Sequence, residues 1–365
     1  MAEAAKEEGS GPADESDDGA MAPNPLIRWF LVGLPVGFVL VSVLVGLSTW
    51  FSDGTLAEAQ PKKISLGSMN QGQVGTEILL RDYVETLTVT IGERHFQRPR
   101  SLKAAQLFLE STLGPSNLGY APRRHIYKVD GESFTNIEAV LSGEGPTSRE
   151  VIVVGAHYDT AAGTPGADDN ASGVAVLLAL AKRFAGKPQK RTIHWVGFTN
   201  EEPPWFQGEG MGSLRYAKDL QQRGVPVKAM ISLESLGYFS DERGSQRYPE
   251  PLAAMYPDTG NFIAVVGNLK SRRLVDFSHR ILEQGGIIPV EKGAFPEMIQ
   301  GIGWSDHWSF WQVGVPAVML TDTAPFRNPH YHQSTDTIHE LDFPRMALAV
   351  SAIQELVIRL AEETW

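Results

Sequence analysis

The pattern of apolar and polar positions divides the chain, after about residue 70, into alternating strand-like and helix-like segments. Short apolar runs bounded by turn residues predict strands, and apolar residues recurring every three to four positions predict helices. Strands are expected at 125–129, 136–141, 151–156, 192–199, 229–233, 262–266, 287–290 and 317–320. Helices are expected at 76–87, 102–113, 171–184, 213–223, 272–284, 305–311 and 343–362. This alternation predicts one α/β domain with helices on both faces of a mostly parallel, mixed sheet.

The longest uncharged stretch of the chain precedes this domain. Residues 29–50 carry no charge, and Trp and Phe lie near both ends. About 20 apolar residues in a helix span the hydrocarbon core of a bilayer, and aromatic residues are enriched at its interfaces. The stretch is therefore predicted to be a transmembrane helix. A buried core helix is the alternative, and a cleaved signal peptide fits less well because the run is long and its leader is acidic.

Polar segments flank the predicted span. Residues 1–24 hold seven acids against Lys6 alone, with too little apolar content to fold, so a disordered acidic tail is expected. Residues 51–69 are polar and contain Gly and Pro, which is typical of a linker, and the folded domain is predicted to cover 70–365. Basic residues near the two ends of the span do not decide its orientation. We expect a single-pass membrane protein that contacts the lipid bilayer through residues 29–50, with the large domain outside the cytoplasm.

Composition restricts the chemistry that the domain can use. The formal net charge of −11 argues against nucleic-acid binding, which needs a basic surface to displace counterions from phosphates. There are no cysteines, so disulfides and thiolate ligands are excluded. Any metal must be held by histidine and carboxylate side chains.

Acids and histidines follow the predicted strands where these end. They are His157 and Asp159, Asp168 and Asp169, Glu201 and Glu202, Glu234, and the histidine-rich loop "PHYHQSTDTIHEL". Each has an ordinary explanation by itself, such as a helix cap for the aspartate pair or a solvated loop for the glutamate pair. Open α/β sheets, however, bind ligands at the carboxyl ends of their strands. Adjacent buried carboxylates there repel each other unless a cation neutralises them, so the cluster predicts a metal site.

The motifs AHYD, GADDNASG, EE, LESLGY and YHQSTDT, in this order, resemble the co-catalytic di-zinc aminopeptidase family. That family includes bacterial leucyl aminopeptidases, glutamate carboxypeptidase II and the one-zinc glutaminyl cyclases. The resemblance covers about residues 70–362. It implies a zinc-peptidase-like fold and two zinc ions bridged by Asp169. The implied ligands are His157 and Glu234 for one ion, and Glu202 and His332 for the other.

The same resemblance implies roles for three further residues and one peptide bond. Asp159 would hold His157 from behind, Glu201 would be the general base, and Tyr331 would help to stabilise the tetrahedral intermediate. The bond between Asp169 and Asn170 would be cis. Three ligand carboxylates and a bridging hydroxide would balance two zinc ions in charge, although nitrogen and oxygen ligands also admit manganese or cobalt.

The implied function is that of a membrane-anchored exopeptidase. It is expected to hydrolyse the first bond of peptides with a free N-terminus, using a water activated by two metal ions. A one-zinc glutaminyl cyclotransferase and a non-catalytic, receptor-like relative are the alternatives, but the full ligand set and Glu201 argue against both. Carboxypeptidase or dipeptidase activity uses the same type of metal centre and stays open.

Two features near the site have no assigned role in the sequence. Trp205 and Phe206 either line an apolar substrate pocket or pack beside the core. Residues 237–261 form a long predicted loop, of a kind that is often functional in compact domains.

Overall fold

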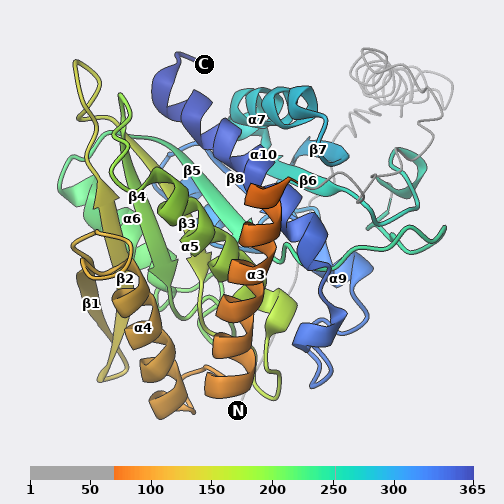
Figure 1. The fold of residues 1–365 in the computed structure, drawn as a ribbon, viewed down its shortest axis with the longest axis horizontal. Helices are drawn as coiled ribbons and strands as arrows, with labels where there is room; N and C mark the ends of the chain where they lie inside the picture. Colours follow the sequence, from red (N-terminus) through yellow and green to blue (C-terminus); the bar gives the residue numbers. More distant parts are fainter. Residues whose placement is uncertain (1–69, 251) are drawn as a thin grey trace, which may run out of the picture. The chain divides into compact units, whose positions relative to one another are not determined.

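The computed structural model describes residues 70–250 and 252–365 (Figure 1). The predicted acidic tail, transmembrane helix at 29–50 and linker at 51–69 all lie outside these residues. Within the described ranges, no helix is both long enough and apolar enough to span a bilayer.

The described residues form a mixed sheet of eight strands in the order β1-β2-β4-β3-β5-β8-β6-β7. The strands are β1 (Arg123–Val129), β2 (Glu132–Leu141), β3 (Val151–His157), β4 (Thr192–Phe198), β5 (Val227–Glu234), β6 (Ile263–Asn268), β7 (Val290–Phe295) and β8 (Ala317–Thr321). The four central strands β4, β3, β5 and β8 run parallel. Pairs β1/β2, β2/β4 and β6/β8 are antiparallel, and β6/β7 is parallel. The predicted mixed α/β sheet with a parallel centre is confirmed.

Helices cover both faces of this sheet (Figure 1). They are α3 (Gln71–Glu85), α4 (Pro99–Leu113), α5 (Gly173–Phe184), α6 (Gly212–Gln222), α7 (Arg272–Gly285), α8 (His307–Gln312), α9 (Ala324–Arg327) and α10 (Phe343–Glu362). The larger core cluster joins one sheet face to α3, α4, α5, α7 and α10, and a smaller one joins the other face to α6 and α8. Burial on both sides explains why the central strands read as continuous apolar runs.

Helix boundaries follow capping chemistry. α3 begins earlier than the predicted residue 76 because Asn70 and Gln73 form a reciprocal capping box at its start. α10 begins at the predicted residue, where Asp342 accepts a hydrogen bond from the backbone N–H of Arg345.

The strand predicted at 287–290 is wrong in position, since β7 spans Val290–Phe295. Ile288 is buried in the core from the turn that precedes the strand, which accounts for the apolar signal. β7 itself lies at an edge of the sheet and carries Glu291 and Lys292, so its pattern is not that of a buried strand.

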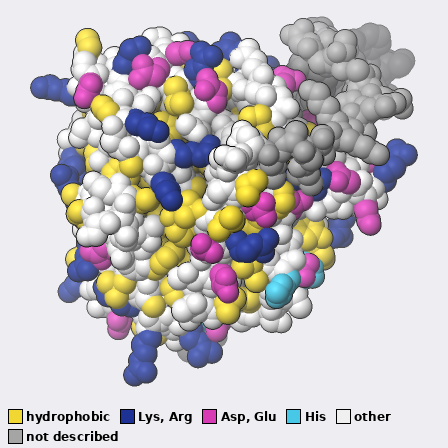
Figure 2. All heavy atoms as spheres, in the orientation of Figure 1, with side chains coloured by type: hydrophobic (Ala, Val, Ile, Leu, Met, Phe, Trp, Pro, Cys, Tyr) yellow, Lys and Arg dark blue, Asp and Glu magenta, His cyan; other side chains and the backbone are white. Residues whose placement is uncertain are grey.

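The surface in Figure 2 shows Lys, Arg, Asp and Glu side chains interspersed, with apolar atoms between them. On this face the two signs of charge are mixed rather than gathered into separate patches.

Candidate metal centre

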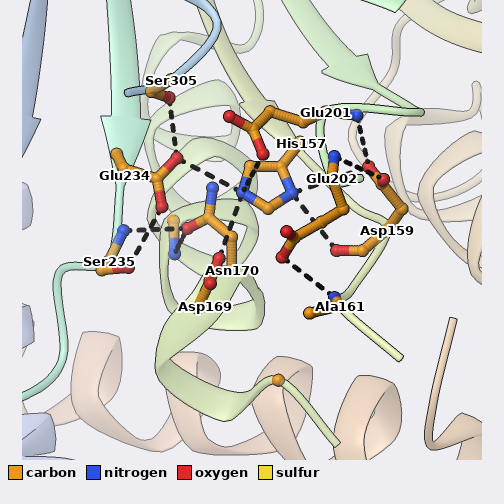
Figure 3. A network of polar contacts seen from close by, with 12 residues as sticks. His157, Asp159, Ala161, Asp169, Asn170, Glu201, Glu202, Glu234, Ser235 and Ser305 are labelled. Atoms are coloured by element: carbon orange, nitrogen blue, oxygen red, sulfur yellow. Dashed lines mark hydrogen bonds and ion pairs between the residues drawn. The ribbon is translucent and has the colours of Figure 1, made fainter. Parts of the chain in front are cut away.

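The predicted site residues come together where the central strands end. β4, β3 and β5 are neighbours in the sheet, so their carboxyl ends open on the same edge. His157 is the last residue of β3 and Glu234 the last of β5. Glu201 and Glu202 follow β4, which ends at Phe198. Figure 3 shows His157 surrounded by the carboxylates of these segments.

Five of the predicted residues form two groups that could hold a metal ion: His157, Asp169 and Glu234, and Asp169, Glu202 and His332. In the first, His157 Nε2 lies 3.2 Å from Asp169 Oδ1 and 3.3 Å from Glu234 Oε2. In the second, His332 Nε2 lies 3.0 Å from Asp169 Oδ2 and 3.3 Å from Glu202 Oε2. Asp169 therefore offers one oxygen to each group.

Both imidazole nitrogens that face these carboxylates lack a hydrogen-bond partner. Nε2 of His157 and Nε2 of His332 are buried and form no hydrogen bond with any residue of the described ranges. Buried polar atoms in proteins nearly always have a partner. Zinc binds histidine nitrogen and carboxylate oxygen, so two unpartnered imidazoles beside carboxylates fit this metal as a donor set.

The electrostatics of the site favour positive charge at the same positions. Burial by itself lowers the pKa of His157, but the carboxylates of Glu234 and Glu201 raise it well above its usual value. For His332, burial is likewise outweighed by Asp169 and Glu202, which raise the pKa to about 10. Burial and the charge of Asp169 raise the pKa of Glu202 to about 7. The cluster thus holds more negative charge than its two imidazoles balance, and a divalent cation would relieve that excess.

Asp159 supports the glutamate pair as well as His157. Its Oδ1 lies 3.6 Å from His157 Nδ1, whereas its own backbone carbonyl is closer, at 3.2 Å. The Asp159 carboxylate also accepts hydrogen bonds from the backbone N–H groups of Glu201, at 3.3 Å, and Glu202, at 3.2 Å. Asp159 therefore orients the histidine of β3 through its backbone carbonyl and the turn after β4 through its carboxylate.

Glu201 differs from the other two glutamates of the site in its hydrogen bonding. Glu202 accepts a hydrogen bond from the Ala161 N–H, and Glu234 accepts one from each of the hydroxyls of Ser235 and Ser305. Within residues 70–250 and 252–365, the Glu201 carboxylate accepts no hydrogen bond, and it lies 3.9 Å from His157 Nε2. Burial and the charge of Glu202 raise its pKa well above the usual range. Its oxygens are therefore not engaged by hydrogen bonds from the described residues.

Backbone conformation around the ligands is unusual. The peptide bond between Asp169 and Asn170 is cis, as the resemblance implies. Asn200, Ser235 and His332 all have positive φ although none is glycine. Such conformations are uncommon for residues with a side chain and tend to cluster at functional sites.

Two residues that sequence reasoning did not assign hold the loops of the site in place. The Asp336 carboxylate accepts hydrogen bonds from the backbone N–H groups of Asp168 and Asp169. The fully buried guanidinium of Arg94 donates to the backbone carbonyls of Tyr158, which follows β3, and of Gly166, which precedes the two aspartates. Asp336 belongs to the YHQSTDT motif and could have been found there, but no local pattern marks Arg94.

The aromatic residues near the site separate into two environments. Tyr331 stacks on the His332 ring, with centroids 3.9 Å apart, and burial keeps its pKa well above the usual value. Trp205 packs instead against Phe96 and Phe134, next to the core cluster. Of the two interpretations of Trp205, packing beside the core is the one observed.

Comparison with known proteins agrees with this arrangement. The model of peptidase family M28 matches residues 136–357. The protein YfbL of Escherichia coli K12 is 40% identical over 238 residues, which cover 63% of this chain and 72% of YfbL. A probable leucine aminopeptidase of Trichophyton verrucosum is 26% identical over 306 residues, covering 80% of this chain and 75% of that protein.

Among solved structures, BSAP, a zinc aminopeptidase from Bacillus subtilis, has the same fold. Its TM-score is 0.62 at 14% identity, over 79% of this chain and 95% of BSAP. The resemblance to the zinc aminopeptidase family is thereby confirmed. The family model covers more than half of the chain, and the histidine and carboxylate groups lie within or beside the matched strands. The chain therefore belongs to peptidase family M28 and is a metallopeptidase.

Proposed function

We propose that this protein is a zinc-dependent aminopeptidase with two zinc ions that share Asp169. His157 and Glu234 complete one ligand set, and Glu202 and His332 complete the other. One observation carries the proposal: two buried imidazole nitrogens without hydrogen-bond partners lie on opposite oxygens of one aspartate. In an ordinary buried network these nitrogens would also form hydrogen bonds, whereas here they only approach carboxylate oxygens.

The roles of the surrounding side chains follow from their contacts. Zinc, when bound, would polarise the scissile carbonyl and acidify the attacking water. Glu201, whose carboxylate accepts no hydrogen bond from the described residues, takes the proton of that water and passes it to the departing amine. Tyr331 keeps its hydroxyl protonated and is placed beside His332 to donate a hydrogen bond to the developing oxyanion. Asp159 fixes the turn that carries Glu201 and Glu202 by accepting hydrogen bonds from their backbone N–H groups.

The substrates are expected to be peptides with a free N-terminus. The relative named as a probable leucine aminopeptidase supports removal of N-terminal residues rather than C-terminal ones. The complete pair of ligand groups argues against a one-zinc cyclotransferase, and the free carboxylate of Glu201 argues against a non-catalytic relative. Attachment to a membrane through residues 29–50, with residues 70–365 as an extracytoplasmic catalytic domain, stays a prediction from the sequence.

The decisive variant is Glu201→Gln, which keeps the shape of the side chain and removes its basicity. Zinc content measured by mass spectrometry should stay at the wild-type value, because Glu201 is not among the proposed ligands. The kcat for leucyl-p-nitroanilide should fall by about 10²- to 10⁴-fold, as expected for loss of a general base.

Glu209→Gln is the matched control, since Glu209 lies on the same loop, exposed and paired with Lys218. It should retain both zinc and activity. Acetylated leucyl-p-nitroanilide, which lacks the free amine, should not be cleaved by an aminopeptidase. Normal turnover by Glu201→Gln would refute the base assignment, and cleavage of the blocked substrate would refute the requirement for a free N-terminus.

A further inference from the structure

A cavity of about 770 Å³, counting its open mouth, adjoins the candidate metal centre. Glu234 and Tyr331 line it on the side of the metal ligands. Residues of β6, β7 and β8, which form its floor, and residues of the segment 237–261 also line it. Its position next to the proposed ligands suits a side chain of a bound substrate.

Strand register decides which residues of the floor face this cavity. Ala264 of β6 is paired with Glu291 on β7 and with Thr321 on β8, and all three line the cavity. The next residue along, Lys292, is paired with Val265, which belongs to the core cluster beneath α7. Because neighbouring residues of a strand point to opposite faces, the Glu291 side chain points into the cavity and the Lys292 side chain points away.

The walls of the cavity are largely aromatic. Tyr248 and Tyr256 stack with centroids 5.5 Å apart, and Trp304 stacks with Phe326 at 6.4 Å. The hydroxyls of both tyrosines are bound elsewhere, to the backbone carbonyls of Pro257 and Lys292. The rings therefore offer their apolar surfaces to the cavity. Aromatic faces attract cations as well as apolar groups.

Glu291 is the acidic group of this floor and has no counter-charge among residues 70–250 and 252–365. Lys292 contributes to the lining, but its side chain points away from the cavity, with Nζ 2.7 Å from Asp276 Oδ1 on α7. Among the described residues, no ion pair or hydrogen bond reaches the Glu291 carboxylate. Burial, followed by the charge of Glu283, raises the pKa of Glu291 to about 7, so its ionised form is costly without a positive partner.

We propose that this cavity receives the side chain of the substrate's N-terminal residue and that Glu291 selects side chains with a positive charge on an apolar stem. Lysine and arginine have that form: the aromatic walls contact the methylene groups, and the carboxylate binds the charged end. This inference rests on the proposed aminopeptidase function. It assigns a role to the segment 237–261, which supplies Tyr248 and Tyr256.

The test compares lysyl- and norleucyl-p-nitroanilide, because norleucine keeps the methylene stem of lysine and lacks the ammonium group. The zinc-loaded wild-type protein should prefer the lysyl substrate in kcat/KM by about tenfold or more. Glu291→Gln should reduce that preference by at least about tenfold, since the neutral amide cannot balance the ammonium. Glu355→Gln is the control: Glu355 is exposed on α10 and paired with Arg359, and its loss should change the ratio by less than about twofold.

A second readout separates this inference from the proposed function. Binding of lysine amide and norleucine amide is measured by calorimetry in the same three proteins. If no aminoacyl substrate is hydrolysed, the proposed function fails, but a preference for lysine amide that Glu291→Gln abolishes would still support the cavity assignment. A wild-type protein that binds or cleaves the norleucyl compound better, or a ratio unchanged in Glu291→Gln, would overturn it and indicate an apolar pocket with a protonated Glu291.

Discussion

Two buried histidine and carboxylate clusters lie on or beside β4, and they differ in one respect. Within β4, His194 contacts Glu138 of β2 and Tyr216 of α6. His194 Nδ1 lies 3.0 Å from Glu138 Oε1 and 2.7 Å from the Tyr216 hydroxyl, which itself donates to Glu138 at 2.6 Å. Each polar group of this trio has a partner within it.

At the carboxyl end of the same strand, the hydrogen bonds and charges of the buried side chains do not balance. The cluster around His157 combines imidazoles that have unpartnered Nε2 atoms with several carboxylates in close approach. Burial is similar in the two places: His194 is 7% exposed and His157 is 1% exposed. What distinguishes them is whether the hydrogen bonds and charges balance without a further ion. A buried histidine and acid pair is thus a sign of a metal site only when its nitrogens lack hydrogen-bond partners.

The strongest test of this contrast is Asp169→Asn against Glu138→Gln. Asp169 offers oxygens to both candidate groups, so its amide should lose most bound zinc and reduce kcat/KM by about 10³-fold or more. Glu138→Gln removes a carboxylate that is just as buried but fully partnered, and both zinc content and kcat/KM should stay within about twofold of the wild type. Equal loss of zinc in the two variants would show that burial, rather than nitrogens without hydrogen-bond partners, marks the site.

Removal of the metal provides the next largest effect. Metal present at about 100 to 1,000 times its dissociation constant stabilises the folded chain by about 3 to 4 kcal/mol, and chelation removes that contribution. For a domain of this size the midpoint of thermal unfolding should fall by about 5 to 10 °C and recover when zinc is restored. Circular dichroism should report a folded chain after chelation, since the core clusters do not depend on the site. An unchanged midpoint after complete metal removal would contradict zinc binding at these residues.

The site could be predicted from the sequence because its acidic and histidine residues lie at or just after the ends of strands. His157, Glu201, Glu202 and Glu234 could be placed together from the rule that parallel strands share a carboxyl edge, before any contact was known. His332 depended on the family resemblance, because its loop has no regular pattern that links it to those strands. The fold was predictable for a similar reason, since buried central strands and amphipathic helices carry strong periodic signals.

The remaining features depend on contacts that no local pattern encodes. The guanidinium of Arg94, for example, donates to the carbonyl of Tyr158, which lies 64 positions further along the chain. Which residues form the cavity floor follows from the register of β6 and β7. The sequence pattern also misplaces β7, because Ile288 packs into the core from the turn before the strand. Polar edge strands and long-range side-chain bonds are settled by tertiary structure, so they could be read only from it.

The smallest expected effect concerns the stability of the fully partnered cluster. Burial by itself raises the pKa of Glu138, but His194 and Tyr216 outweigh it and lower the pKa to about 2. Since that value lies below the pKa of an unfolded glutamate, near 4.3, the ionised side chain stabilises the fold above about pH 5 and loses this contribution as the pH falls toward 2. Glu138→Gln should therefore reduce the free energy of unfolding by about 1 to 2 kcal/mol at pH 7, measured with urea, and by less at pH 3.5. Glu132→Gln, on the same strand but exposed, should cost less than about 0.5 kcal/mol at either pH. If the difference in free energy of unfolding between wild type and Glu138→Gln increased on acidification, the carboxylate of Glu138 would not be held in its ionised form. The cluster around His194 could then not be taken as one in which the charges balance.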